Sequence, residues 1–434
     1  MDPYDLYPRD TKENQQCPAS TPLLCGSRTL GRGLCVKREA ECDERTTEKR
    51  PILEQEINAA GAAFAYDTEN LGRGCYVDPD ELHIDYEKDY EEYESIPNVF
   101  SVMTYNMWGL AKNKDLKGLF QLRKDLLLDT LIKADSDCIC LQEMSEYAYE
   151  ELKDYIKTFE EHGFVSEAPY KTIQGRGRTV DVYYMSRYRP KRLVIYGIKG
   201  VLGYTNCFMV VEYPNLVIFN MYSQAGSVGS VGQEKVWIHY SRCRYDIMNM
   251  IYEMIQKKYK GRSVVVTGDF NFHLDGTERE WPETAMLRKL EDIGFIDSWR
   301  SKNDGPGYTE NTNENYMRWN HKFMEKMYRF DAVLYRPVGS SWKVHSSQVF
   351  GKGVKRLSAK DSDWFVKNIT SIKNWEKSGP KGEQLKGVKE NSKGKRILIN
   401  ASDHFGVRTV FATPFRKTRR NRKSGSRATR SASR

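Results

Sequence analysis

Long hydrophobic runs are missing from this chain of 434 residues. No stretch approaches the roughly 18 consecutive apolar residues that a membrane-spanning helix needs. The first residues, MDPYDLYPRDTKENQQC, also lack the apolar centre of a secretion signal. These absences argue against a membrane span and against the usual route of secretion. We therefore expect a soluble protein inside a cell, in the nucleus or the cytoplasm, or in a virion.

The cysteines near the N-terminus lack the spacing of a zinc site. Cys17, Cys25, Cys35 and Cys42 are separated by seven, nine and six residues, whereas zinc sites are typically built from Cys-x-x-Cys pairs. Residues 1–50 therefore read as a Cys-rich segment that either forms disulfides or stays reduced. Four unconnected cysteines in a poorly ordered leader are an equal alternative.

Acidic residues are missing from the C-terminal tail. Residues 416–434 contain nine Arg or Lys and no Asp or Glu, so the formal net charge of +9 leaves 9 − 9 = 0 for the rest of the chain. Residues 351–396 hold thirteen Lys or Arg against five Asp or Glu. Such segments bind polyanions of any sequence by releasing counterions. Nucleic acid is the partner that we expect, and anionic membrane lipids or acidic proteins remain alternatives.

Shifts in composition divide the chain into four parts. After the Cys-rich segment, residues 51–97 read as an acidic linker, because residues 76–96 carry nine acidic residues and one lysine. We expect one folded domain over residues 98–413, with a Lys-rich insertion at 351–396. Residues 414–434 form a basic tail whose Ser, Arg and Thr content predicts disorder.

Short apolar strands alternate with helical stretches from residue 98 onward. Strands are predicted for NVFSVMTYNMW, DCICLQE, LVIFNMYS, SVVVTGDFNF, RFDAVLYR and HFGVRTVFA. Helices are predicted for FQLRKDLLLDTLIKA, YAYEELKDYIKTFEEHG and WIHYSRCRYDIMNMIYEMIQKKYKG. This mixed order favours an α/β or α+β sandwich over a helical bundle or an all-β barrel.

Five of the predicted strand ends carry polar side chains that burial alone does not explain. They are Asn106, Glu143, Asp269 with Asn271, Asp331, and Asp403 with His404. Loops at strand ends are where sites are usually assembled. Oxygen ligands with one imidazole and no cysteine suit Mg²⁺ or Mn²⁺ better than zinc, and such an ion stabilises charge on a phosphoryl oxygen.

Each of these residues has a structural alternative when it is taken alone. Asn106 and the GDFN segment are also typical of turns, and Glu143 precedes a predicted helix that it could cap. Asp331 could form a salt bridge with Arg329, and His404 could be a structural histidine. The catalytic interpretation is favoured because all five strand ends occur in one chain, each after an apolar strand.

The segments TYNMWGL, LQEM, FNMYSQAG, GDFN, RFDAVLY and SDHFGV together resemble the endonuclease/exonuclease/phosphatase superfamily, which includes DNase I. The resemblance covers roughly residues 98–413. It implies a DNase I-like fold, in which two packed mixed β-sheets are flanked by helices in a four-layer sandwich, with the site at one edge. A Cys-rich leader before an enzyme domain also resembles proteins of large DNA viruses.

The resemblance also implies roles for individual residues. Glu143 matches the metal-binding glutamate, and Asn106 and Asp403 match neighbours of the metal. Asp269 matches the acid that orients or activates water, with Asn271 beside it on the phosphate. His404 matches the histidine that supports the pentavalent phosphate, and Asp331 matches the acid that pairs with it.

One segment departs from the family pattern. Many members carry Asn-x-His before the long helix, whereas this chain has Asn220, Met221 and Tyr222. The hydroxyl of Tyr222 can replace the missing donor. The alternative is that Tyr222 is a stacked aromatic residue and that the site has lost one donor. We expect Asn220 and Arg329 to contact the substrate.

The substrate is open at this stage, because a fold does not define it. The basic tail favours a nuclease, whereas the Asn-x-Trp-Gly turn at residues 106–109 looks closer to sphingomyelinase-type members, which hydrolyse phospholipid headgroups. A third hypothesis is an inactive structural protein that binds nucleic acid through its tail. Retention of the principal carboxylates and His404 argues against the third, and the oligomeric state is left open.

Overall fold

The computed structural model describes residues 23–25, 34–36, 83–109, 114–166, 182–199, 205–225, 234–275, 282–317, 327–339, 342–368 and 397–413. The predictions for the linker up to residue 82, for most of the Lys-rich insertion and for the basic tail lie outside these residues, as do Cys17 and Cys42. Cys25 and Cys35 lie in a short antiparallel pair, β1 (Leu23–Cys25) and β2 (Leu34–Val36).

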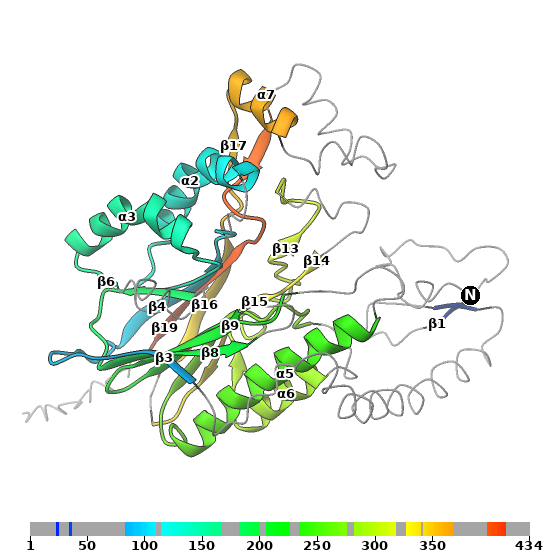
Figure 1. Cartoon of the computed structure of the whole chain (residues 1–434). Helices are drawn as coiled ribbons and strands as arrows, with labels where there is room; N and C mark the ends of the chain where they lie inside the picture. The colour runs from blue at the N-terminus through cyan, green and yellow to red at the C-terminus, as the bar shows by residue number, and fades with distance from the viewer. Residues whose placement is uncertain are drawn as a thin grey trace, which may run out of the picture.

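Two large mixed sheets form the centre of the molecule (Figure 1). The seven-stranded sheet has the order β12-β15-β11-β10-β9-β8-β3. Its strands, in chain order, are β3 (His83–Asp89), β8 (Arg192–Lys199), β9 (Thr205–Glu212), β10 (Val217–Tyr222), β11 (Val264–Asp269), β12 (Ile296–Asp297) and β15 (Asp331–Arg336). Within it, β10 and β11 are parallel, and the other pairs are antiparallel.

The six-stranded sheet has the order β16-β19-β4-β5-β7-β6. Its strands are β4 (Val99–Asn106), β5 (Cys138–Gln142), β6 (Val165–Ser166), β7 (Val182–Ser186), β16 (Lys343–Phe350) and β19 (Gly406–Ala412). Here β4 and β5 form the parallel pair. Each sheet therefore contains one parallel pair among antiparallel neighbours.

The two sheets pack face to face because their strands are apolar on both sides. In β10, Ile218 belongs to the core between the sheets, whereas Val217 and Phe219 belong to the core under the helices. This alternation follows from the two-residue period of a strand. Strands buried on both faces read as continuous apolar runs, which is why these segments were recognisable in the sequence.

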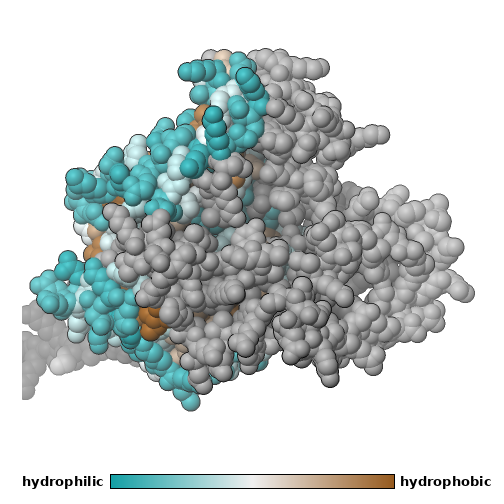
Figure 2. Space-filling model, viewed as in Figure 1, coloured by the Kyte–Doolittle hydropathy of each residue, from teal (hydrophilic) through white to brown (hydrophobic). Residues whose placement is uncertain are grey.

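The described part of the chain contains five helices (Figure 1). They are α2 (Lys114–Ala134), α3 (Glu146–Glu161), α5 (Glu234–Lys257), α6 (Pro282–Asp292) and α7 (Ala359–Asn368). Four of them flank the sheets, and the last, α7, packs against α2. Apolar side chains of α5 and α6 pack on the seven-stranded sheet, and those of α2 and α3 join the core of the six-stranded sheet. In the view of Figure 2, the coloured outer surface around α2, α3 and α7 is mostly hydrophilic. The predicted fold class is therefore confirmed.

The start of the folded domain lies earlier than we expected. Strand β3 lies inside the segment that was predicted to be a linker, and it pairs with β8 at the sheet edge. Composition was misleading here because the acidic residues alternate with Tyr86, which packs on the core, while Glu87 and Asp89 pair with Arg192. The Lys-rich insertion begins with regular structure, since β17 (Val354–Arg356) pairs with β18 (Leu398–Asn400) and α7 follows β17. None of the helices in the described part has the length and hydropathy of a membrane span.

Gly268 is required where β11 passes closest to β10. Its φ is +139°, and a Cβ atom at this position would lie 1.9 Å from the carbonyl oxygen of Met221. Gly268 precedes Asp269, so the close approach of β11 to β10 also sets the backbone position of Asp269.

We expect Gly268→Ala to lower the free energy of unfolding by at least about 1–3 kcal/mol, the usual cost of a strained backbone conformation. Urea unfolding measures the effect. Gly261→Ala is the matched control, because no atom lies within 4 Å of its Cβ position, and we expect a change of at most about 0.5 kcal/mol. Equal losses in the two variants would contradict this explanation.

Candidate active site

The carboxyl ends of the two parallel strand pairs lie at the same edge of the sandwich. In the six-stranded sheet, Asn106 is opposite Gln142. Asn106 therefore lies beside Glu143, the residue that follows Gln142. In the seven-stranded sheet, Tyr222 is opposite Asp269. Asn106 joins the two groups directly, because its Nδ2 lies 2.8 Å from Oδ2 of Asp269.

Antiparallel neighbours bring the remaining residues to this edge. Strand β15 begins with Asp331, which is the cross-strand partner of Asp269. His404 precedes β19, whose Val407 pairs with Thr104 of β4. The strand register therefore brings together residues that are up to about 300 positions apart in the chain.

Asn106 connects two carboxylates. Its Nδ2 donates to Oε1 of Glu143 at 3.1 Å as well as to Asp269. Its Oδ1 accepts from the backbone N–H of Trp108 at 2.9 Å, as a turn residue would. Asn106 is thus a turn residue whose side chain also lies within the cluster of carboxylates.

Glu143 carries one satisfied and one unsatisfied oxygen. Oε1 accepts from Asn106 and from the hydroxyl of Tyr222 at 2.9 Å, while Oε2 is shut off from solvent and has no hydrogen-bond partner among the described residues. Burial raises the pKa of this carboxyl, and the charge of Asp403 raises it further. The alternative role as a helix cap is wrong, since Ser145 caps α3 by accepting from the N–H of Ala148.

Asp269 is fully buried and held by amide groups. Its Oδ1 accepts from the backbone N–H of Asn271 at 2.8 Å, and its Oδ2 accepts from Asn106 and from Nδ2 of Asn271 at 3.2 Å. Asn271 also donates to the carbonyl of Ser223 at 2.9 Å. Burial, followed by the charge of Asp331, raises the pKa of Asp269 to about 7.

His404 pairs with Asp331, as the resemblance implied. Its Nδ1 lies 2.9 Å from Oδ2 of Asp331, and both side chains are buried. Burial lowers the pKa of the imidazole, but the charges of Asp331 and Asp269 outweigh that effect and raise the pKa to about 10. His404 is therefore protonated at neutral pH. The second oxygen of Asp331, Oδ1, is buried without a hydrogen-bond partner.

Two sets of side chains in this site offer ligand atoms for a cation. Among the described residues, Asp269, Asp331 and His404 have ligand atoms within 4.8 Å of one another. The predicted metal residues Glu143 and Asn106 adjoin this set through Asp269, and Asp403 is connected to them through Ser402. The Ser402 hydroxyl lies 2.7 Å from the carbonyl of Asn106 and 3.3 Å from Oδ1 of Asp403.

The chain matches the model of the endonuclease/exonuclease/phosphatase family over residues 103–404, which is more than half of its length. The chain belongs to this family. The matched segment begins in β4 and ends at His404, so it spans every residue of the site described above.

Solved structures of similar proteins share little sequence with this family member. Truncated TDP2 from Caenorhabditis elegans is 13% identical over 72% of this chain and 97% of that chain, with a TM-score of 0.43. SmcL is 14% identical over 73% and 100%, with a TM-score of 0.48. D. rerio TDP2, solved with a single-strand DNA product, is 14% identical over 73% and 99%, with a TM-score of 0.39. No curated protein sequence matches the chain.

Arg123 of α2 supports the site of this family member and was not predicted. Its buried guanidinium donates to the carbonyls of Met107 at 2.7 Å, Ala401 at 2.6 Å and Trp108. It thereby joins the loop after Asn106 to the loop before Asp403. Arg123 shares a helix face with Phe120 and Leu127, and a charged residue on an apolar face is the signal that could have identified it.

Asn220 and Arg329, which we expected to contact the substrate, lie outside the cluster. Asn220 is buried between the sheets, where its Nδ2 donates to the carbonyls of Leu141 and Tyr183 and its Oδ1 accepts from Gln142 at 2.7 Å. These contacts join the two sheets at a position two residues before Tyr222 in β10. A fully buried side chain with three partners is not placed to meet a substrate.

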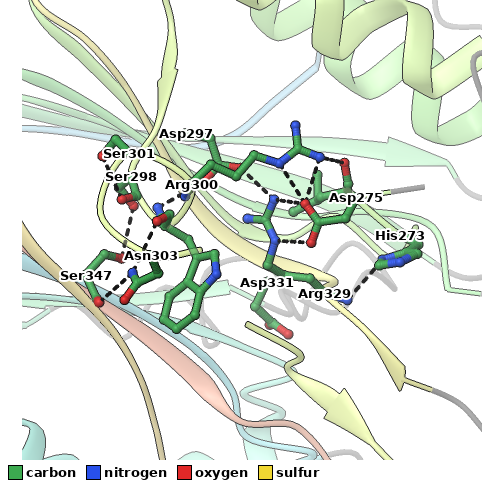
Figure 3. A network of polar contacts seen from close by, with 12 residues as sticks. His273, Asp275, Asp297, Ser298, Arg300, Ser301, Asn303, Arg329, Asp331 and Ser347 are labelled. Carbon is green, nitrogen blue, oxygen red and sulfur yellow. Dashed lines mark hydrogen bonds and ion pairs between the residues drawn. The ribbon is translucent and has the colours of Figure 1, made fainter. Parts of the chain in front are cut away.

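Arg329 belongs to a separate ion-pair network (Figure 3). Its guanidinium donates to both oxygens of Asp275 and to Asp297 at 2.6 Å, while the side chain is fully buried. Figure 3 shows the Asp331 carboxylate turned away from it, so the predicted alternative of an Arg329–Asp331 salt bridge is wrong. Arg300 pairs with Asp275 from the exposed side.

We expect Arg329→Met to lower the free energy of unfolding by about 3–5 kcal/mol, because two carboxylates lose a buried partner. Arg300→Met is the matched control. Its side chain is 49% exposed, and exposed ion pairs contribute about 0–1 kcal/mol. Urea unfolding of both variants measures the difference. A stable Arg329→Met protein with impaired substrate affinity would restore the substrate-binding hypothesis.

The pair of His404 and Asp331 makes stability depend on pH in the metal-free protein. The folded pKa of about 10 lies above the unfolded value of about 6.5. The stabilisation is therefore complete below pH about 6.5 and is lost as the pH rises toward about 10. The difference in unfolding free energy between the wild type and His404→Gln should shrink over this range.

Imidazole NMR titration of the metal-free protein tests the same pair directly. The His404 resonance should titrate near pH 10. Asp331→Asn should lower this pKa, because it removes the negative charge that raises the pKa most. A wild-type His404 that titrates near its ordinary value would contradict the ion pair.

Proposed function

We propose that the chain is a Mg²⁺-dependent phosphodiesterase that cleaves nucleic acid, DNA or RNA. One observation carries the proposal. Asp269, Asp331 and His404 are buried together with ligand atoms within 4.8 Å of one another. In this group burial raises the pKa of Asp269 to about 7, and the neighbouring carboxylates raise the pKa of His404 to about 10. Paired titratable groups whose pKa values are pushed apart are typical of acid–base chemistry.

Asp269 serves as the group that orients the attacking water and takes its proton. Asn106 and Asn271 hold both carboxylate oxygens in fixed directions. A pKa of about 7 allows this carboxylate to accept a proton near neutral pH, which is the condition for an effective general base.

His404 serves as the fixed positive charge beside the phosphate. Asp331 accepts from Nδ1 and so fixes the direction of the imidazole ring. Because the imidazole is already protonated and held in place, it stabilises the negative charge that develops in the transition state without reorganisation.

The residues present fit a bound Mg²⁺. Glu143 keeps a buried oxygen without a hydrogen-bond partner, and its raised pKa reflects a carboxylate that needs a nearby cation or proton. Glu143 and Asp403 would hold the ion, with Asn106 beside them, and Asp269 and His404 are left for the reacting groups. When bound, Mg²⁺ supplies Lewis-acid stabilisation of phosphoryl charge. Direct ligation by His404 is disfavoured, because its proton is held by Asp331 and Asp269.

The basic segments favour nucleic acid over other phosphodiesters. Residues 416–434 supply nine positive charges without an acidic residue. A basic segment increases the affinity for a polyanion without restricting its sequence. A phospholipid headgroup is the competing substrate class, because anionic membranes attract the same charges.

We expect the purified protein to cleave nucleic acid in the presence of Mg²⁺ and Glu143→Gln to reduce turnover by at least about 100-fold, since an electrostatic group of the site is lost. The test uses a matched panel of labelled single-stranded, duplex and abasic DNA, RNA, sphingomyelin vesicles and phosphoinositide vesicles. Chelation of the metal should abolish the same activity. The circular dichroism spectrum and the unfolding midpoint of Glu143→Gln serve as the folding control.

Removal of residues 416–434 separates the tail from the chemistry. We expect weaker substrate affinity and a shallower dependence on salt, with turnover at saturation unchanged. Turnover of lipid alone would reassign the tail to membranes. A wild-type protein that cleaves none of these substrates would favour the hypothesis of an inactive structural protein.

A further inference from the structure

A row of aromatic rings leads outward from His404. The ring of Phe330 lies 6.2 Å from the His404 imidazole, and Tyr328 is stacked on Phe330 at 5.4 Å with an interplanar angle of 17°. His273 follows at 5.1 Å from Tyr328, and Tyr308 lies 6.3 Å from His273. We call Phe330, Tyr328, His273 and Tyr308 the aromatic row.

Three separate segments build this row. Tyr328 ends β14 (Met327–Tyr328), which pairs with β13 (Glu310–Asn311), and Tyr308 precedes β13. His273 follows β11, and its Nδ1 accepts from the backbone N–H of Arg329 at 3.2 Å, a contact drawn in Figure 3. The backbone around the row is therefore tied to the same strands that position Asp269 and Asp331.

The row begins in the buried core and ends at partly exposed rings. Phe330 is a buried core residue beside His404, whereas Tyr328, His273 and Tyr308 are half-buried. None of the four rings belongs to the apolar clusters that join the sheets and helices in the described part of the chain. The half-buried rings therefore carry aromatic surface away from the site.

We propose that the aromatic row stacks an unpaired nucleobase next to the phosphate held at His404, so that the substrate is single-stranded or locally unpaired nucleic acid. This inference rests on the proposed nuclease function. Aromatic side chains bind bases of any identity through their flat faces, which suits recognition that does not depend on sequence. A duplex keeps its bases stacked inside and offers no such face without unpairing.

The arrangement of the rings favours a base over a choline headgroup. A quaternary ammonium group is held by aromatic rings that surround a common centre. Here the rings are arranged in succession, each within 5.1–6.3 Å of the next, and the pair Tyr328–Phe330 is nearly parallel. Such a row extends along a chain of nucleotides.

The test pairs a protein variant with a substrate variant. A single-stranded oligonucleotide carries 2-aminopurine, whose fluorescence is quenched by stacking, and a matched set carries a baseless sugar at successive positions near the scissile phosphate. Binding is measured on Glu143→Gln, which should hold the oligonucleotide without cleaving it, and cleavage is measured on proteins with Glu143 intact. Tyr328→Leu removes a ring, Tyr328→Phe keeps it, and Tyr155→Leu is the control, because Tyr155 is an exposed tyrosine on α3.

We expect Tyr328→Leu to weaken binding and to raise KM by roughly tenfold, with kcat nearly unchanged, since stacking on one ring contributes about 1–3 kcal/mol per base. Tyr328→Phe and Tyr155→Leu should leave KM unchanged. Removing the base at one position should abolish the effect of Tyr328→Leu at that position alone. Tyr308→Leu gives the same test if Tyr328→Leu does not fold.

Two results would overturn the inference. One is a nuclease whose KM responds neither to Tyr328→Leu and Tyr308→Leu nor to the missing base. The other is competition by choline without quenching of 2-aminopurine, which would assign the row to a lipid headgroup. A wild type that quenches 2-aminopurine but cleaves nothing would refute the proposed function and retain the row, so the two failures are distinguishable.

Discussion

Asp269 and Asp331 are cross-strand partners in the antiparallel pair β11–β15, and both carboxylates are buried. Two like charges that are shielded from solvent repel one another strongly. Burying an isolated carboxylate also costs free energy. A ring nitrogen of His404 lies within 4.8 Å of a carboxylate oxygen of each, and their charges raise the pKa of the imidazole to about 10. The positive charge of His404 therefore offsets part of the cost of burying two carboxylates.

The surrounding contacts hold this arrangement in place. The hydroxyl of Thr309 accepts from the backbone N–H groups of Phe330 and Asp331, and the carbonyl of Thr309 accepts from Phe405. One residue therefore fixes the backbone on both sides of the ion pair between Asp331 and His404. Arg123 does the same for the loops that carry Asn106 and Asp403. Such preorganisation matters because small displacements of reacting groups are costly in rate.

The sequence allowed the fold and most of the cluster to be predicted, because long apolar runs mark buried strands and polar residues at their ends stand out against them. Asn106, Glu143, Asp269, Asp331 and His404 were found in this way. Asn220 and Arg329 were placed wrongly, since the sequence does not tell on which side of a strand end a polar side chain finds its partners. The partners of Arg329, Asp275 and Asp297, are 54 and 32 positions away from it. Strand β3 was missed because its acidic composition hid an alternating pattern.

Negative and positive charge are concentrated in different parts of the chain. Residues 1–350 hold 45 Lys or Arg and 53 Asp or Glu, which gives 45 − 53 = −8, whereas residues 416–434 carry +9. A polyanionic substrate is repelled by an acidic body unless a local positive field draws it in. His404 and Arg123 are buried and too few to supply that field at long range, because salt screens charges beyond roughly 10 Å. Under the proposed function, the basic tail acts before contact, and the charges of the site act only once the phosphate has arrived. Affinity and catalysis would then depend on different parts of the sequence.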